Sequence, residues 1–461
     1  MPSTAALLYC AVNGVANCTN GIGRQTKTLL ATLEHSYPHL AEAAGPFTPY
    51  VAVPEPGPAT WNYNPDDLAY ARAIVEGLGG HILPLPYETD GPLWCPQTWA
   101  RLCSGAAAAA RALAVQHRRV LAIAVDTPFA GLTGLLDGAE RIDVLLALFS
   151  TAKITERPAP TPAHVAWEQA AITAVNHSRN SWVAGIGTYL SRHLRTEYGL
   201  DAGRIVPWPS GLHLRAADLA PVPVRDAETT VRRFGIPTDG PIVAAVGRTD
   251  ATKGLDQLIE ALAPLREHVH LAAIAVRTDD ERARLFDTYR HRSAALGLRA
   301  TWIGSFDRDL PRALAALPGT RVMACPSRGE TLANIVFETG LWAEHHGAIA
   351  LAPARDGFPE QITDGHNGLL YPPEHPGALT AAIVRSLNLP RSEHQRMRAA
   401  AAERVRAERD ATEHLATLLT RFWRTTAPAP DTLTGHPGAP GTRQPRSQAP
   451  TSTTGTLEAA P

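Results

Sequence analysis

Two glutamates, eight residues apart, carry the clearest chemical signal in the second half of the chain. Glu330 and Glu338 lie in the stretch VMACPSRGETLANIVFETGLWA, where an apolar run ending in proline predicts a buried strand and Gly329 opens a predicted helix over 331–344. At ~1.5 Å of rise per residue, their carboxylates would be about 12 Å apart along this helix. That separation is close to the reach from the sugar to the ribose of a sugar nucleotide.

The start of the predicted helix offers groups that bind an anion. Its first N–H groups have no partner within the helix, and the helix dipole adds about half a positive charge there. A diphosphate would therefore meet this end, while Glu330 would face sugar hydroxyls and Glu338 the ribose. The other residues expected to contact such a donor are Thr331, Leu332, Ala333 and Asn334. In the alternative interpretation, Glu330 only stabilises the helix dipole and Glu338 is a solvated surface residue.

A basic pair follows an earlier predicted strand. The sequence PIVAAVGRTDATKGLDQLI, over 241–259, predicts a buried strand, a turn that carries Arg248, and a helix that begins near Lys253. Only three of the 43 basic residues are lysines, namely Lys27, Lys153 and Lys253. Open α/β sheets bind anions beyond the carboxyl ends of their strands, so Arg248 and Lys253 are expected to neutralise a diphosphate.

Three motifs in this half resemble the nucleotide-binding domain of family 4 glycosyltransferases, also described as glycosyl transferases group 1. They are GRTDATKGLDQLIEAL, PSRGETLANIVFETGLWA and RDGFPEQITDGHNGLLYPP, in this order between residues 247 and 373. The resemblance implies the α/β fold called GT-B, in which two Rossmann-like, doubly wound domains face a cleft. It also implies a retaining transferase in which Arg248, Lys253 and Glu330 are catalytic.

The resemblance further implies a reaction that needs no metal and no cofactor besides the sugar donor. The acceptor attacks on the face from which the diphosphate leaves, and a leaving phosphate oxygen takes the acceptor's proton. Asp307 and Asp309 have a spacing that holds a metal–nucleotide in other glycosyltransferases, but here we assign them to a helix start.

The first half departs from the family pattern in two places. Family members often carry a histidine where this chain reads Phe149-Ser150-Thr151-Ala152-Lys153. In the segment IVPWPSGLHL, Ser210 and His213 replace the usual asparagine and aspartate. These departures favour a second hypothesis, a catalytically silent protein that binds nucleotide sugars on the same fold.

A glycine-rich loop near the start of the chain is a further candidate for donor binding. In NGVANCTNGIGRQTKTLL, Gly21 and Gly23 allow a ligand to approach the backbone just before a helix predicted to begin near Arg24. The resembling family places such a loop opposite the donor phosphates. Arg24 and Lys27 either assist there or are solvated. A tight turn without a ligand is the alternative.

Acceptor binding has weaker candidates in the first half. Asp126 ends the buried run VLAIAVD and is a candidate general base or acceptor ligand, or else it caps the turn that follows. Lys153 is a candidate polar contact in place of the absent histidine. Trp61, Tyr63 and Trp94 lie in proline-rich insertions and either stack on an acceptor or pack within their loops.

Composition bounds the other possibilities. The chain has 461 residues, 44% of them apolar, and a net charge of −1, so its charge does not indicate a nucleic-acid footprint or an acidic membrane partner. Five cysteines without CxxC spacing argue against disulfides and zinc, and fit a reducing cytoplasm. The start of the chain lacks a basic leader, and no run reaches the ~20 apolar residues of a membrane span.

The domain organisation predicted from these patterns has five parts. They are an acceptor-binding domain over 1–215, a linker over 216–240, a nucleotide-sugar domain over 241–390, a helix over 391–424 that crosses back to the first domain, and a disordered tail over 425–461. The sequence sets no oligomeric state.

The function predicted from the sequence is transfer of a sugar from a UDP- or GDP-linked donor to a small-molecule hydroxyl acceptor. The Arg-, Ala- and Pro-rich composition is typical of GC-rich genomes, where such enzymes often serve antibiotic biosynthesis and modify aminocyclitols or aminoglycosides. Lipid and polysaccharide acceptors are alternatives. A nucleotide-sugar epimerase or a phosphorylase on the same fold is a third hypothesis.

Overall fold

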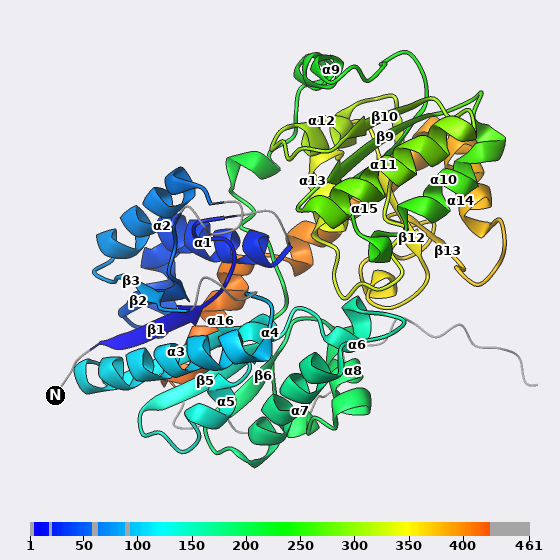
Figure 1. Cartoon of the computed structure of the whole chain (residues 1–461). Coiled ribbons are helices and arrows are strands. Elements are labelled where there is room, and N and C mark those ends of the chain that lie inside the picture. Colours follow the sequence, from blue (N-terminus) through cyan, green and yellow to red (C-terminus); the bar gives the residue numbers. More distant parts are fainter. Residues whose placement is uncertain (1–3, 18–20, 58–62, 88–92, 425–461) are drawn as a thin grey trace, which may run out of the picture. The chain divides into compact units, whose positions relative to one another are not determined.

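The computed structural model (Figure 1) describes four stretches of the chain: residues 4–17, 21–57, 63–87 and 93–424. The predicted tail over 425–461, Trp61 and Cys18 lie outside them. In the described stretches, Cys10, Cys95, Cys103 and Cys325 are all free thiols.

The first half of the chain forms a parallel sheet of seven strands in the order β3-β2-β1-β4-β5-β6-β7. The strands are β1 (Ala5–Cys10), β2 (Phe47–Pro54), β3 (Ile82–Leu85), β4 (Arg119–Val125), β5 (Ile142–Ala147), β6 (Ser181–Gly185) and β7 (Ile205–Pro207). The helices are α1 (Gly21–Ala44), α2 (Pro65–Gly77), α3 (Pro96–Gln116), α4 (Asp126–Phe129), α5 (Leu132–Leu135), α6 (Ala152–Thr155), α7 (Pro162–His177), α8 (Thr188–Tyr198) and η1 (Ala202–Arg204).

The central strands of this sheet are buried along almost their whole length. Every residue of β1 and β5 is buried, as are six of the seven residues of β4. Such continuous runs arise because helices cover both faces of a parallel sheet. The order of the strands reverses between β1 and β4, and open α/β sheets bind ligands beyond the carboxyl ends of strands at such a switch point.

The second half forms a parallel sheet of six strands in the order β10-β9-β8-β11-β12-β13. The strands are β8 (Ile242–Arg248), β9 (His270–Val276), β10 (Ala300–Ile303), β11 (Thr320–Ala324), β12 (Ile349–Pro353) and β13 (Leu369–Tyr371). The helices are η2 (Ala217–Leu219), α9 (Val224–Arg233), η3 (Ala251–Lys253), α10 (Leu255–Leu262), η4 (Ala263–Leu265), α11 (Asp280–Ala295), α12 (Leu310–Ala316), α13 (Asn334–Trp342), η5 (Phe358–Glu360), α14 (Ala378–Asn388), α15 (Arg391–Glu408) and α16 (Ala411–Arg424).

Alternate residues of β8 enter two different cores, one on each face of the sheet. Ile242 and Ala244 pack with α9, α12 and α13, whereas Val243 and Ala245 pack with α10, α11 and α14. This sheet is therefore covered on both sides, which confirms the predicted α/β class. Its switch point lies between β8 and β11.

The segments around the second sheet differ from the prediction in two places. The predicted linker over 216–240 contains α9, whose Ala227 and Val231 are buried in a core with α12. The predicted helix over 391–424 is two helices, α15 and α16, separated at Arg409-Asp410. Helix α16 lies beside α1, as Figure 1 shows in orange and blue. It buries six apolar side chains in the first domain's core, namely Leu415, Ala416, Leu418, Leu419, Phe422 and Trp423.

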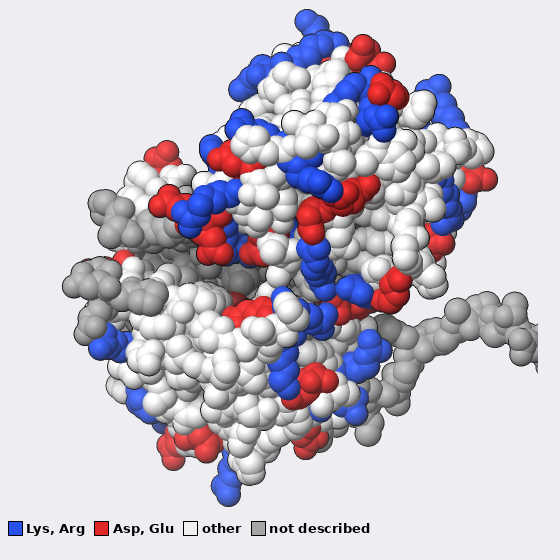
Figure 2. All heavy atoms as spheres, turned by 45° about the vertical axis from the view of Figure 1, so that its right-hand side comes forward, with Lys and Arg blue, Asp and Glu red and all other residues white. Residues whose placement is uncertain are grey.

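Charges of both signs are mixed on the face of the molecule seen in Figure 2. On the face in Figure 2, Lys and Arg lie interspersed with Asp and Glu. Among the described residues, no helix combines the length and the apolar character that crossing a bilayer requires.

Candidate active site

The switch point of the second sheet brings Lys253 and Glu330 into contact. Lys253 ends η3 after β8, and Glu330 follows β11; Lys253 Nζ lies 2.6 Å from Glu330 Oε2. Between the two loops, Gly254 adopts φ +67°, and a Cβ there would lie 2.1 Å from the carbonyl oxygen of Pro326. Because only glycine permits this approach, the close packing of the loops depends on it.

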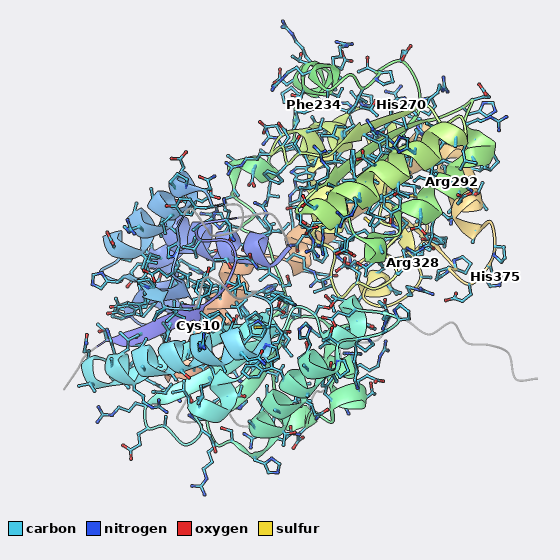
Figure 3. The ribbon with its side chains drawn as sticks, viewed as in Figure 1. Cys10, Phe234, His270, Arg292, Arg328 and His375 are labelled. Carbon is cyan, nitrogen blue, oxygen red and sulfur yellow. The ribbon has the colours of Figure 1, made fainter. Side chains whose placement is uncertain are left out.

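Arg328 joins the same two loops by hydrogen bonds. The sequence did not single this residue out. Its backbone N–H donates to the carbonyl of Thr252 at 2.7 Å, and its guanidinium (Figure 3) binds Asp256 Oδ1 and Oδ2 at 2.9 and 2.5 Å. This bidentate pair fixes the backbone on either side of Lys253 and Glu330. In a chain so rich in arginine, the residue type alone gave no signal.

Arg248 is the last residue of β8 and shares an acid with a second arginine. Its guanidinium lies 4.0 Å from Asp250 Oδ2, and that of Arg282 lies 3.6 Å from the same atom. Burial raises the pKa of Asp250, but hydrogen bonds from Thr252 and the charges of both arginines outweigh it, so the pKa is lowered. The side chain of Arg248 is 38% exposed, which leaves its charge available at the carboxyl end of the strand.

The helix after β11 begins three residues later than predicted. Helix α13 starts at Asn334, so Glu330 lies in the preceding loop and the predicted separation along one helix does not apply. Buried Gln361 holds this loop: Ala333 N–H donates to Gln361 Oε1, and Gln361 Nε2 donates to Ala333 O, both at 3.0 Å. The Ala333 amide expected to meet a diphosphate is therefore engaged with the Gln361 side chain. The backbone carbonyl of Gln361 accepts from Asn367 Nδ2 at 2.9 Å.

The neighbouring residues of the loop are fixed by both halves of the chain. The Thr331 hydroxyl donates to the carbonyl of Phe149, and Leu332 packs partly against the first core. The Gly357 N–H donates to the Glu330 carbonyl at 3.0 Å. The loop that carries Glu330 is thus braced on two sides.

The glycine-rich loop meets this region through Gly21. Its carbonyl accepts from Asn334 Nδ2 at 3.2 Å, and Gln25 Nε2 donates to Asn334 Oδ1 at 3.1 Å. Gly23 instead packs against Gly14. It is buried, and a Cβ added to Gly14 would lie only 2.5 Å from the carbonyl oxygen of Gly23. Helix α1 begins at Gly21 rather than near Arg24. Of the two predicted donor contacts in this loop, only Gly21 lies beside another predicted donor residue.

Glu338 lies in the second turn of α13 and is paired with Arg24 of α1. Arg24 Nε lies 3.0 Å from Glu338 Oε1, and its Nη1 lies 2.5 Å from Asp218 Oδ2. Burial raises the pKa of Glu338, and the charge of Arg24 opposes that rise. Arg24 was expected at the phosphates or in solvent, and it binds two carboxylates instead.

Asp126 marks the switch point of the first sheet. It directly follows β4 with φ +61°, is 6% exposed, and its Oδ1 accepts from Phe149 N–H at 3.4 Å. Burial raises the pKa of Asp126 to about 7, with a further contribution from the negative charge of buried Glu168. A non-glycine residue held in the left-handed region at a strand end is typical of functional sites.

Lys153, the other residue predicted at the acceptor, is directed to α8. Its Nζ donates to the carbonyl of Glu197 at 2.7 Å and lies 4.6 Å from the ring centroid of Tyr198. Its ammonium is therefore engaged on α8, and its role at the acceptor stays a prediction.

Acidic and histidine side chains do not gather into a metal site in the part of the chain that the structure describes. Asp307 Oδ1 accepts from the N–H groups of Asp309 and Leu310 at 2.9 and 2.7 Å. Since α12 begins at Leu310 with Asp309 at its N-cap position, the assignment of these aspartates to a helix start is confirmed.

Comparison with known proteins identifies the second half of the chain. Residues 226–404 match the model of the family described as glycosyl transferases group 1. A D-inositol 3-phosphate glycosyltransferase from Corynebacterium glutamicum is 29% identical over 207 residues, which cover 44% of this chain and 45% of that enzyme. The chain therefore spans less than half the length of this relative.

Solved structures match nearly the whole chain. A sucrose-phosphate synthase from Thermosynechococcus elongatus has a TM-score of 0.68 at 20% identity, covering 91% of this chain and 98% of that one. HepE from Anabaena, in complex with UDP and glucose, has a TM-score of 0.66 at 15% identity, covering 90% and 98%. The fold is thus the GT-B fold that the resemblance implied, and residues 226–404 form a domain that matches the glycosyl transferases group 1.

Proposed function

We propose that this chain transfers a sugar from a nucleotide diphosphate sugar to a hydroxyl acceptor, with retention at the anomeric carbon. The observation that carries the proposal is the contact of Lys253 with Glu330 at the switch point of the second sheet, 2.6 Å between Nζ and Oε2. Arg248 supplies a second positive charge at the end of the neighbouring strand. Cations at this edge suit a diphosphate, which supports the predicted catalytic roles of all three residues.

The proposed chemistry is mainly electrostatic. The bond between the anomeric carbon and the phosphate oxygen breaks, and the acceptor oxygen forms a bond to the same carbon from the same face. The acceptor's proton passes to the leaving phosphate oxygen. Arg248 and Lys253 stabilise the charge that grows on the diphosphate, and Glu330 both holds Lys253 and accepts from sugar hydroxyls. The chain's own residues therefore act by neutralising and orienting, without a covalent intermediate.

The donor and acceptor classes follow from chemistry and from the names of similar proteins. A UDP- or GDP-linked sugar fits the paired cations, and Glu338 with its neighbours Asn334 and Gly21 is the proposed ribose and phosphate side. One relative is named for inositol phosphate, a cyclic polyol. We propose a small hydroxyl acceptor for this chain, including the aminocyclitols expected from its composition, with lipid-linked and polysaccharide acceptors as the alternatives.

The test measures release of nucleoside diphosphate from UDP-glucose and from GDP-mannose, with and without hydroxyl acceptors. Release that depends on Lys253 and gives an α-linked product supports a retaining transferase. Donor binding in a thermal-shift assay without any turnover would identify a silent binding protein instead. Turnover that requires orthophosphate would identify a phosphorylase.

A further inference from the structure

We infer that Trp94 forms an acceptor platform that takes the apolar face of a ring-shaped polyol, such as a pyranoside or a cyclitol. The inference rests on the proposed transfer function and adds the class of its acceptor. Trp94 directly precedes the N-cap of α3 and is 45% exposed, although tryptophan is among the most costly side chains to leave in water. Its exposed face is therefore accessible to a ligand.

Trp94 is the outer member of a column of three indoles. Its ring meets that of Trp99 edge to face, with centroids 5.5 Å apart and planes at 83°. Trp99 is fully buried, and its centroid lies 5.9 Å from that of Trp167 on α7. Because the two inner rings are packed between α3 and α7, the outer ring has rigid support. A ligand that stacks on it would order little additional structure.

The inner end of this column is bonded to the turn that holds Asp126. Trp167 Nε1 donates to the carbonyl of Thr127 at 2.8 Å, and the Thr127 hydroxyl donates to Glu168 Oε1 at 2.9 Å. Two consecutive residues of α7 therefore hold the residue that follows Asp126. The platform and the candidate acceptor carboxylate share one support.

The topology brings these parts to one edge of the first sheet. Helix α3 runs from the loop after β3 back to β4, and α7 lies between β5 and β6, so in a parallel sheet both helices start at the carboxyl edge. Trp94 and Trp99 lie at the start of α3, and Trp167 lies in the second turn of α7. Asp126 follows β4 at the same edge, which is where open α/β sheets bind ligands.

The indole face of Trp94 favours a cyclic polyol over an acyclic one as the acceptor. An indole face buries the C–H face of a pyranose or cyclitol, while the hydroxyls around that ring stay free for carboxylates such as that of Asp126. An acyclic polyol has no flat apolar face to bury. Of the three aromatic residues that the sequence suggested for stacking, Tyr63 is partly buried against the first core and Trp61 lies outside the described residues.

The experiment compares ring and chain acceptors in wild type, Trp94→Ala and Trp94→Phe. Nucleoside diphosphate release from UDP-glucose and GDP-mannose is measured with D-inositol 3-phosphate, methyl α-D-glucopyranoside, or glycerol. We expect a ring acceptor to stimulate release more than glycerol does. Trp94→Ala should raise the KM for the ring acceptor about tenfold with little change in kcat, and Trp94→Phe should retain most of the affinity. Val115→Ala, a 77% exposed site at the far end of α3, is the matched control.

Other outcomes would contradict the platform, the stacking interaction or the proposed function. If neither ring acceptor exceeds glycerol, or if Trp94→Ala keeps the wild-type KM, the platform is overturned while donor turnover leaves the proposed transferase intact. If Trp94→Phe loses as much as Trp94→Ala, stacking is not the interaction. If wild type releases no diphosphate from either donor under any condition, the proposed function fails, and the platform with it.

Discussion

Lys253 Nζ and Glu330 Oε2 lie 2.6 Å apart, although 77 residues separate them in the sequence. The cation follows β8 and the acid follows β11, the two strands between which the order of the second sheet reverses. Neither side chain is deeply buried, with 29% and 16% of the side-chain surface exposed. The pair is therefore open to a ligand and already held in register, which is the arrangement that electrostatic catalysis requires.

Replacing Lys253 by Ala should lower kcat by roughly 100-fold or more, because it removes a charge that stabilises the leaving diphosphate. The measurement is initial-rate kinetics of diphosphate release. Arg292→Ala is the control, since Arg292 of α11 (Figure 3) forms an exposed ion pair with Glu260 of α10 and its loss should leave turnover unchanged. Unchanged turnover in Lys253→Ala would remove this residue from the site.

The contact itself is tested by a double-mutant cycle with Glu330→Gln. Because each side chain orients the other, the double variant should lose less activity than the two single losses multiplied together. Strictly multiplicative losses would mean that Lys253 and Glu330 act independently.

Removing the Arg24 charge should make donor binding more sensitive to acid. Burial already raises the pKa of Glu338, and Arg24 opposes that rise, so Arg24→Ala should raise this pKa further. The carboxylate that we propose accepts from ribose hydroxyls would then be protonated at a higher pH, and the donor KM should rise earlier as pH falls. The measurement is donor KM against pH. Lys27→Ala, a cation on the same helix that pairs with Asp67, is the control. A profile identical to that of wild type would exclude Glu338 from donor binding.

Gln361→Leu should lower the free energy of unfolding by roughly 1–3 kcal/mol and raise the donor KM. Its side chain satisfies both the N–H and the carbonyl of Ala333, and leucine would leave these buried groups unpaired. Gln361→Glu keeps the acceptor for the N–H and should show a smaller defect. Denaturant unfolding and donor kinetics measure the two effects. Equal defects in both variants would contradict a role through this pair of hydrogen bonds.

Asp126→Asn should change how stability depends on pH. The folded-state pKa of Asp126 is about 7, above its ordinary value of 3.8, so its favourable contribution is complete below 3.8 and is lost as pH rises to about 7. Asparagine also tolerates a positive φ and cannot ionise. The variant should therefore gain stability relative to wild type across this range, by about 1.4 kcal/mol for each pH unit at most. Denaturant unfolding at several pH values measures it. A difference that stays constant with pH would show that Asp126 is not held protonated by its burial.

The sequence determined which residues stand at the ends of strands. Alternating apolar runs and amphipathic segments predicted two parallel sheets, and the motifs between residues 247 and 373 predicted the class of the second domain. These inferences succeeded because strand period, helix period and turn residues are local properties of the chain. Arg248, Lys253 and Glu330 became candidates in this way, since each lies within a few residues of a buried strand.

The tertiary structure decided which of those residues meet, and through which partners. Gln361 takes the Ala333 amide, Arg24 takes Glu338, and Lys153 turns to Glu197. No local pattern encodes these pairs, because each joins segments more than 25 residues apart. The packing of the two sheets decides which long side chains come within reach of each other. Only the folded chain could therefore show that Lys253 and Glu330 form an ion pair.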